Sequence, residues 1–598
     1  MSNAHSAFSA ALTPSRRSAL CEWCSQRPIL TAVLLAVLLG LAELPFATFM
    51  ADDLIQLGAL EGVLPGSSLG PLRLYTISDG VPAHVHAMQN AGALPWFFSP
   101  DFKMAFFRPL SSALLAFDHA LWGLRPIGYR LQAMLWFVAL VGALAMVLRR
   151  VLPGPIGALA LIVFAVSGIH ASLFWNATRH VVVAGALGML ALAAHIDWRE
   201  STRRSVRVLS VVGFVLALCA SEAALGIIAY LVAYESLYAV GDTRTRLRAL
   251  APTLALVVVY TCFYALAGLG GAGNAGYADP LRAPLAFLAQ LPGRWLFLVG
   301  SMVGGGGADL WLLRADLHGL FILIAALMVV MVALLLRATW ATATPGERRG
   351  SRWLIVGALA AALPFAGTPI GSRCLVLPML GGSVAIAFVL QRWWAVLRQR
   401  SGLRYRLISA ACVFLAVIHL ALAPLGRLTA PYLMREMMHE RLATAMQRID
   451  LDPARLAEQR VVVLRAPDFI VGLGILPFRA LYRLPLPRSW RTLAFSSTPL
   501  SYTRTAERTL ELAVAAGTIN APGLNAGDVI DLDGMRVSVL AHDGAGPTRV
   551  AFQFDRPLED ASLVFLTWSG DRFDRVVFPP AGPVEAGVSP APAAKPPL

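Results

Sequence analysis

The chain has 598 residues, of which 57% are hydrophobic and 14% are charged, and its mean hydropathy is +0.65. This composition excludes an ordinary soluble domain and indicates an integral membrane protein. The net charge of +15 does not indicate nucleic-acid binding, because the arginines cluster in alternate loops between apolar segments, as orientation signals do.

The first 28 residues carry Arg16, Arg17 and Arg27 ahead of an apolar run, an arrangement that resembles a signal sequence. The run is long enough to span a bilayer, and no small-residue cleavage site precedes Asp52. We therefore expect a cytoplasmic N-terminus over residues 1–28 and an uncleaved first helix.

Apolar segments of about 20 residues recur along the chain, and this is the length that a membrane-spanning helix needs. Arginine-dense connections at 149–150, 199–207, 244–248, 337–352 and 392–406 alternate with loops poor in positive charge, so we expect them to face the cytoplasm. The predicted fold is an α-helical polytopic membrane domain over residues 29–425. It has about eleven spans, near 29–49, 129–148, 154–172, 180–197, 206–222, 223–240, 249–269, 317–336, 353–370, 374–391 and 406–424.

An odd number of spans places the C-terminus outside the cytoplasm, and the expected location is a bacterial inner (plasma) membrane. Two outer loops are long, at 50–128 and 270–316, and long loops of this kind usually carry function. In the first loop, residues 108–122 have apolar side chains at helical spacing, which predicts a helix on the membrane surface. In the second, the glycine run at 304–307 makes 294–313 a surface or re-entrant segment rather than a span.

The composition changes after the last span. Residues 426–460 predict a charged, helical connector, and residues 461–578 contain short β-type runs, with Asp533–Gly534 as a hairpin turn. We expect a small β-sandwich or barrel outside the cytoplasm, followed by a disordered Pro- and Ala-rich tail at 579–598.

Asp52 and Asp53 form an acidic pair where the first span leaves the membrane on its predicted outer face. Two carboxylates in the interface are costly unless something pairs or uses them. One of them is explained equally well as the cap of the following helix, but one cap suffices. A carboxylate here could take a proton from a hydroxyl group, or hold a metal.

Three arginines lie at the outer edges of spans, away from the arginine-dense loops: Arg108, Arg179 and Arg373. A guanidinium fork matches a phosphate, so the set favours a phosphate site, although any one of them is explained by snorkelling to headgroups. Glu222 lies at the outer junction of two spans and is either functional or the ion-pair partner of one of these arginines.

His84 and His86 in the first outer loop are weak candidate metal ligands together with the acidic pair. The sequence therefore predicts no definite cofactor and leaves a divalent metal open. It contains no phosphate-binding loop, nucleophile elbow or H-E-x-x-H motif, so it excludes a transporter with its own ATPase within this chain.

The order of several motifs resembles the GT-C superfamily of polytopic membrane glycosyltransferases, in particular the membrane part of the tetratricopeptide-repeat O-mannosyltransferases and their bacterial relatives. The resemblance covers residues 1–425 and rests on Asp52–Asp53, Phe107 to Leu110, Gly123 with Pro126 and Gly128–Tyr129, Trp175 to Arg179, Ser221–Glu222, and Ser372–Arg373 with Leu377–Pro378. The chain departs from the family where Arg130 replaces a usual His, Ser221 a Lys and Ser372 a Glu, and a β-rich domain replaces the repeats.

The resemblance implies transfer of a sugar, expected to be a hexose such as mannose, from a polyprenyl-phosphate donor to a hydroxyl group of a glycan or protein acceptor on the outer face. Asp52 or Asp53 would act as general base, Arg179 and Arg373 as the phosphate clamp, and Arg108, Arg130 and Glu222 as supporting groups. Two other classes stay open: a flippase or transporter of lipid-linked glycans, which predicts charges in mid-span and internal repeats, and a non-catalytic scaffold of cell-envelope assembly.

Overall fold

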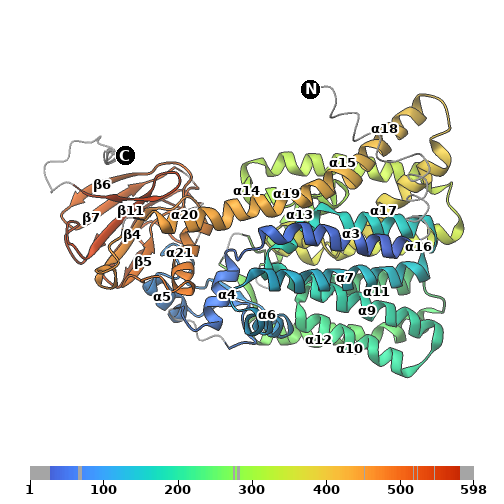
Figure 1. The fold of residues 1–598 in the computed structure, drawn as a ribbon, viewed down its shortest axis with the longest axis horizontal. Coiled ribbons are helices and arrows are strands. Elements are labelled where there is room, and N and C mark those ends of the chain that lie inside the picture. Colours follow the sequence, from blue (N-terminus) through green and yellow to red (C-terminus); the bar gives the residue numbers. More distant parts are fainter. Residues whose placement is uncertain are drawn as a thin grey trace, which may run out of the picture. The chain divides into compact units, whose positions relative to one another are not determined.

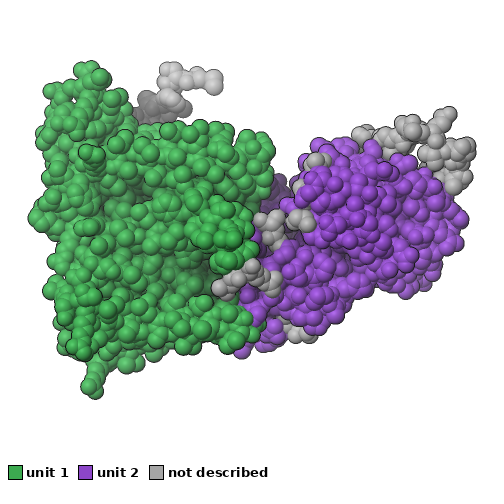
Figure 2. All heavy atoms as spheres, turned by 180° about the vertical axis from the view of Figure 1, so that it is seen from behind, with its two compact units in different colours: residues 1–47, 107–267, 278–432 green, residues 48–106, 268–277, 433–598 purple. Residues whose placement is uncertain are grey.

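The computed structural model describes residues 27–64, 70–273, 276–278, 280, 283–449, 451–515, 517–521, 523–544 and 546–578. The expected tail and nearly all of the expected N-terminal segment lie outside these residues. The chain forms two compact units (Figure 2). Unit 1 comprises residues 1–47, 107–267 and 278–432, and unit 2 comprises 48–106, 268–277 and 433–598.

Unit 1 is helical (Figure 1). Its α-helices are α3 (Pro28–Glu43), α6 (Pro109–Trp122), α7 (Pro126–Val151), α8 (Pro155–Val166), α9 (His180–Ser201), α10 (Arg204–Ala220), α11 (Leu225–Leu237), α12 (Thr243–Leu266), α13 (Pro284–Val303), α14 (Leu310–Leu313), α15 (His318–Trp340), α16 (Pro345–Ala361), α17 (Met379–Arg392), α18 (Leu403–Val417) and α19 (Ala423–Arg435). Six of them, α3, α6, α7, α8, α13 and α16, begin with a proline in the first turn, where its missing N–H costs nothing.

Within the described residues, nine helical segments are long and apolar enough to cross a membrane. The expected class, a multi-pass membrane protein, is therefore confirmed, but the expected count of about eleven spans is not. Helices α8, α10 and α11 lie at predicted spans and have 12, 17 and 13 residues, fewer than the ~20 that a bilayer core needs. Between α10 and α11, Ser221 accepts a hydrogen bond from the Ala223 N–H and interrupts the helix.

Packing within unit 1 distinguishes core helices from peripheral ones. The apolar length of α17, from Met379 to Leu390, is fully buried, whereas only 17% of the most apolar window of α15 is buried. A helix with apolar residues all round and few of them buried is suited to contact with lipid. The bundle therefore has the surface expected of a membrane domain.

Helix α13 overlaps the stretch expected to be a surface or re-entrant segment. It is long enough to span, yet its contacts with α15 show that the two helices run in the same direction. The Cβ position of Gly293 is 3.2 Å from Ile322, and that of Gly304 is 3.8 Å from Met328, near the middle of α15. Because α15 begins at His318, the chain between the two helices must turn back before α15 starts.

Unit 2 contains a five-stranded antiparallel sheet and a four-stranded mixed sheet. The five-stranded sheet has the order β6 (Ser501–Ala506), β7 (Thr509–Ala513), β10 (Pro547–Phe554), β9 (Met535–His542), β8 (Val529–Leu532). The four-stranded sheet has the order β12 (Phe573–Val576), β11 (Leu563–Trp568), β4 (Arg460–Arg465), β5 (Ser489–Thr492). Side chains from both sheets share one hydrophobic core, so the expected β-sandwich is present.

Two features of this sandwich were not predicted. Strand β4 pairs in parallel with both β5 and β11, and α21 (Phe469–Leu481) crosses between β4 and β5. A parallel pair needs such a crossover, whereas the predicted sandwich was purely β. The expected turn at Asp533–Gly534 does connect β8 to β9.

The first outer loop is divided between the two units: residues 107–128, with α6, belong to unit 1, whereas residues 50–106 belong to unit 2 and not, as expected, to the membrane domain. It contributes α4 (Asp52–Leu60), α5 (Pro82–Ala91), β1 (Thr76–Asp79) and β2 (Lys103–Ala105), and β2 pairs with β3 (Gly270–Ala272) from the second outer loop. Trp96 is buried in the core of the sandwich, where its indole N–H donates to the Leu493 carbonyl at 2.9 Å. The loop and the β-rich region therefore form one packed core.

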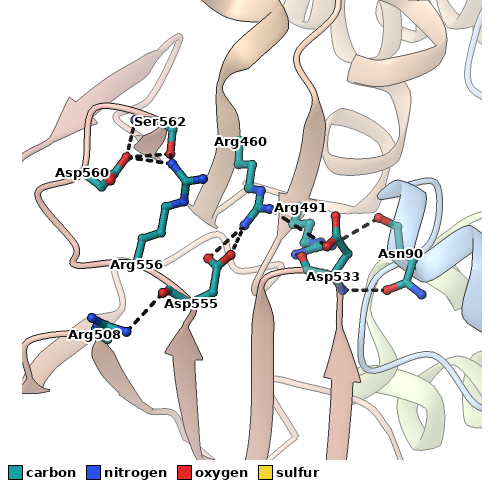
Figure 3. A network of polar contacts seen from close by, with 9 residues as sticks. All are labelled: Asn90, Arg460, Arg491, Arg508, Asp533, Asp555, Arg556, Asp560 and Ser562. Carbon is teal, nitrogen blue, oxygen red and sulfur yellow. Dashed lines mark hydrogen bonds and ion pairs between the residues drawn. The ribbon is translucent and has the colours of Figure 1, made fainter.

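A polar network fixes α5 to the sandwich (Figure 3). Asn90 Oδ1 accepts from the Asp533 N–H at 2.9 Å, and Arg491 donates to the carbonyls of Asp533 at 2.6 Å and Asn90 at 3.2 Å. Arg460 forms an ion pair with Asp555 at 2.8 Å. Burial lowers the pKa of Arg491 to about 10, so it stays charged at neutral pH.

The expected boundary between the membrane domain and the connector, at 425–426, does not coincide with a break in the helix. Residues Leu403–Gln447 form one helical run that includes α18, α19 and α20 (Arg441–Gln447). The run passes from unit 1 to unit 2 after Tyr432. The predicted connector is therefore helical as far as Gln447.

Candidate functional site

The acidic pair occupies the first turn of α4 in unit 2. Asp53 is 1% exposed, and its Oδ2 accepts a hydrogen bond from the Met50 N–H at 3.1 Å. This carboxylate stabilises the turn that leads into the helix, close to the capping role considered for one of the two. Asp52, at the first position of α4, is half-buried. Of the pair, Asp52 is therefore the better candidate for acid–base chemistry.

Helix α4 is held in place by contacts with the β-rich region of the same unit. It packs against α21, and Glu61 at its end forms an ion pair with Arg483 at 2.7 Å. The Phe49 carbonyl, three residues before α4, contacts His439 Nδ1 at 3.1 Å. Segments far apart in sequence thus fix the position of the acidic pair within unit 2.

Arg108 and Glu222 form a bidentate ion pair in unit 1. Arg108 Nε donates to Glu222 Oε2 at 2.9 Å, and a second guanidinium nitrogen contacts the other carboxylate oxygen. Ser111 Oγ also donates to the Ala220 carbonyl at 2.8 Å, so the start of α6 is fixed to the end of α10. Glu222 is therefore the partner of a predicted arginine, which was one of its two expected roles.

Arg179 pairs with Asp118, which the sequence argument did not single out. Arg179 Nη1 lies 2.5 Å from Asp118 Oδ2, and the two residues are 3% and 0% exposed. Burial raises the pKa of Asp118 to about 6, although the charge of Arg179 acts in the opposite direction. The pair is therefore ionised at neutral pH, and Arg179 could bind a phosphate only by breaking it.

Arg130 belongs to a buried cluster with Glu43 and Arg427. Glu43, 1% exposed, contacts Arg130 through one oxygen and accepts from Arg427 Nε through the other at 2.9 Å. The Arg130 guanidinium also lies over the Phe174 ring, 4.7 Å from its centroid. These contacts join α3, α7 and α19, so Arg130 supports the bundle.

Arg373 has different surroundings from the other arginines. It is half-buried and donates to the Pro369 carbonyl at 3.0 Å, and within the described part of the chain it forms no ion pair. The neighbouring Ser372 donates through its backbone N–H to Asp309 at 2.9 Å and through its hydroxyl to the other Asp309 oxygen. Asp309, in the return turn after α13, thereby fixes the loop that carries Arg373.

His180, at the start of α9, lies close to several of these groups. Its Nδ1 lies 2.8 Å from Ser221 Oγ, and the charges of Arg108 and Arg373 both act on its imidazole ring. Arg179 precedes it directly in the chain. Unit 1 therefore brings the three predicted phosphate-binding arginines to one end of α9, together with Glu222.

The two candidate metal ligands do not converge. Both lie on α5, where His84 pairs with Asp79 at 2.7 Å and His86 Nε2 contacts the Asp531 carbonyl at 2.8 Å. Residues two apart on a helix point to different sides. Among the residues that the structure describes, no group of three or more His, Cys, Asp or Glu side chains is arranged to hold a metal.

Comparison with solved structures finds three informative likenesses. ArnT from Cupriavidus metallidurans bound to undecaprenyl phosphate is 14% identical over 77% of this chain and 85% of that one, with a TM-score of 0.38. The archaeal oligosaccharyltransferase AglB from Archaeoglobus fulgidus, in complex with an inhibitory peptide and a dolichol-phosphate, is 12% identical over 78% and 65%, with a TM-score of 0.41. The arabinofuranosyltransferase AftD from Mycobacteria is 16% identical over 77% and 33%, with a TM-score of 0.36.

At these identities and scores the likeness is distant and assigns no substrate. No protein-family model and no curated protein matches the chain.

Proposed function

We propose that this protein is a membrane glycosyltransferase that moves a sugar from a polyprenyl-phosphate donor to an acceptor hydroxyl group at the outer face of the membrane. The observation that carries the proposal is Arg373. It is a half-buried guanidinium without an ion-pair partner among the described residues, on a loop that Asp309 holds in place. A guanidinium that is held in place and forms no direct ion pair is suited to a phosphate.

We assign Arg108 and Arg179 a structural role and not the phosphate-binding role that the sequence suggested. Arg179 and Arg108 already form ion pairs with Asp118 and Glu222, so their charges are compensated within the protein. A buried ion pair that loses one partner leaves an uncompensated charge, so neither pair opens cheaply. Arg373 is therefore the proposed phosphate ligand.

In the proposed reaction, Asp52 accepts the proton of the acceptor hydroxyl as the oxygen attacks the anomeric carbon. The bond between that carbon and the donor phosphate oxygen breaks, and the phosphate leaves with the electron pair. The transition state resembles an oxocarbenium ion, with negative charge growing on the phosphate. A guanidinium placed at that charge typically contributes a few kcal/mol.

The sugar is proposed to be a hexose and the acceptor a glycan or a protein. A transporter would need charges in mid-span. Among the buried charges in the described part of unit 1, Arg294 lies in the middle of α13, whereas the two buried glutamates lie near helix ends. Glu43 ends α3, and Glu235, which pairs with His195 at 2.7 Å, lies two residues before the end of α11. Structural pairing at helix ends accounts for both.

Binding of undecaprenyl phosphate to the purified protein in lipid nanodiscs tests the phosphate site. We expect Arg373→Ala to weaken binding by roughly 10- to 100-fold, because one charge-assisted contact of a few kcal/mol is lost. Arg373→Lys should restore part of the affinity. Arg404→Ala, an exposed arginine of the predicted cytoplasmic loop at 392–406, is the matched control. Equal affinity of Arg373→Ala and the control would refute the role of Arg373.

A further inference from the structure

A groove lies between the start of α3, the end of α7 and the start of α8. It has a volume of about 560 Å³, and its walls are apolar, with Ile29, Leu30, Val33, Leu148, Ala158 and Leu161 among the lining side chains. Two arginines, Arg27 and Arg149, belong to the same lining. The groove thus combines an apolar trough with two cations.

Small residues keep the groove open. The turn between α7 and α8 contains Gly154, whose φ of +102° favours glycine and whose Cβ position has no neighbour within 4 Å. Ala158, one turn into α8, lines the groove and is half-buried. A larger side chain at Ala158 would occupy the space that the groove provides.

The neighbouring arginines at the end of α7 have different surroundings. Arg150 lies 3.8 Å from Asp197 and donates to the Met146 carbonyl at 3.4 Å. Arg149 is exposed, lines the groove and forms no ion pair within the described ranges. The positive charge of Arg149 is therefore available to a ligand in the groove, whereas that of Arg150 is used within the protein.

The groove is distant from the candidate site. Tyr129, whose carbonyl accepts from Arg179, and Val151 lie near opposite ends of α7, 22 residues apart, which corresponds to about 33 Å of helix. By the distribution of arginines, the end that carries Arg149 is the one expected to face the cytoplasm. A ligand in the groove would therefore belong to the other side of the membrane.

We propose that this groove binds an anionic phospholipid of the cytoplasmic leaflet. An acyl chain lies along the apolar wall formed by α3, α7 and α8, and the lipid phosphate is held by Arg27 and Arg149. Arginine matches phosphate oxygens through its planar fork, and basic pockets between spanning helices on the cytoplasmic side suit anionic headgroups. The site is independent of the proposed glycosyl transfer.

Native mass spectrometry of the full chain tests the proposal, with dioleoyl phosphatidylglycerol and dioleoyl phosphatidylcholine as probes. We expect wild-type protein to retain phosphatidylglycerol preferentially. The variant with both Arg27→Gln and Arg149→Gln should bind it about 25-fold more weakly, at roughly fivefold per arginine. Arg203→Gln, an exposed arginine of the next predicted cytoplasmic loop, is the matched control and should bind as the wild type does.

A second variant separates the acyl chain from the headgroup. Ala158→Trp should fill the groove and reduce retention of both lipids, while leaving the thermal unfolding midpoint close to that of the wild type. The proposal is overturned if phosphatidylglycerol is not preferred, if the double arginine variant retains it fully, or if inorganic phosphate alone displaces it. It is also overturned if specific binding appears only after deletion of residues 1–26, since the N-terminal segment of the chain would then occupy the groove.

Discussion

Arg179 is 3% exposed, and its guanidinium lies 2.5 Å from the carboxylate of Asp118, which is fully buried. Arg373, on a nearby loop of the same unit, is half-buried and contacts a backbone carbonyl. Removing one member of a buried ion pair leaves a charge without compensation, whereas removing a partly exposed cation without a carboxylate partner does not. Loss of Arg179 should therefore reduce stability, whereas loss of Arg373 should reduce phosphate binding.

We expect Arg179→Ala to lower the free energy of unfolding by about 3–5 kcal/mol, because the carboxylate of Asp118 is left buried and unpaired. Arg373→Ala should change stability much less and act on phosphate binding. Thermal unfolding midpoints of the two variants, measured in the same detergent, check the prediction. Similar midpoints for both variants would show that Arg179 is not held by the buried pair, and Asp118→Asn combined with Arg179→Ala should recover part of the loss.

The ion-pair partners of the candidate site residues were the part of the site hardest to predict from the sequence. The outer arginines and Glu222 could be found because charges at the ends of apolar spans are rare and visible. Glu222 was anticipated as a partner of one of these arginines, but Asp118 and Glu43 were not, because Arg179 and Asp118 are 61 residues apart and Arg130 and Glu43 are 87 apart. No local pattern indicates which distant carboxylate will meet a given guanidinium.

At the scale of the element, the β8–β9 hairpin shows how a short turn can hold larger parts of unit 2 together. Gly534 has a φ of +72°, and a Cβ built on it would overlap the Arg460 guanidinium. Arg460 is buried and paired with Asp555, so it cannot move without breaking that pair (Figure 3). The backbone carbonyl of the adjacent Asp533 accepts a hydrogen bond from Arg491, and its backbone N–H donates one to Asn90 of α5.

We expect Gly534→Ala to destabilise unit 2 more than Gly527→Ala does. Both positions have a positive φ, which costs a residue with a Cβ about 1–2 kcal/mol, but the Cβ position of Gly527 has no neighbour within 4 Å. The difference between the variants should therefore report the Arg460 contact, at about 1–3 kcal/mol. Resistance to limited proteolysis of the 433–598 region measures it. Equal resistance of the two variants would contradict this account of the hairpin.

Elements with a strong local signal were predicted well. Apolar runs of about 20 residues, alternating β-type runs and an Asp-Gly turn each carry their own local pattern. Helix α21 was missed because its 13 residues are almost entirely apolar, a pattern that fits a buried strand or a buried helix. The parallel pairing of β4 with β5 and β11 depends on that helix, so it was missed as well.

At the scale of the whole molecule, unit 2 is built from three separate parts of the chain, which include residues 50–106 of the first outer loop and the beginning of the second. The packing of Trp96 in the core of the sandwich and the β2–β3 pairing depend on contacts between residues far apart in sequence, which single-sequence patterns do not reveal. The β-rich region is therefore more than an appended module. Its helix α21 packs against α4, the helix that contains Asp52 and Asp53.

Transfer of a radiolabelled hexose from undecaprenyl phosphate to acceptors in isolated membranes tests the central claim most directly. We expect Asp52→Asn to reduce transfer by at least about 100-fold, because a general base typically contributes that much or more. Asp79→Asn in β1, which removes an exposed carboxylate paired with His84, should leave transfer unchanged. Full transfer by a variant with both Asp52→Asn and Asp53→Asn that still inserts normally would contradict the proposed acid–base role.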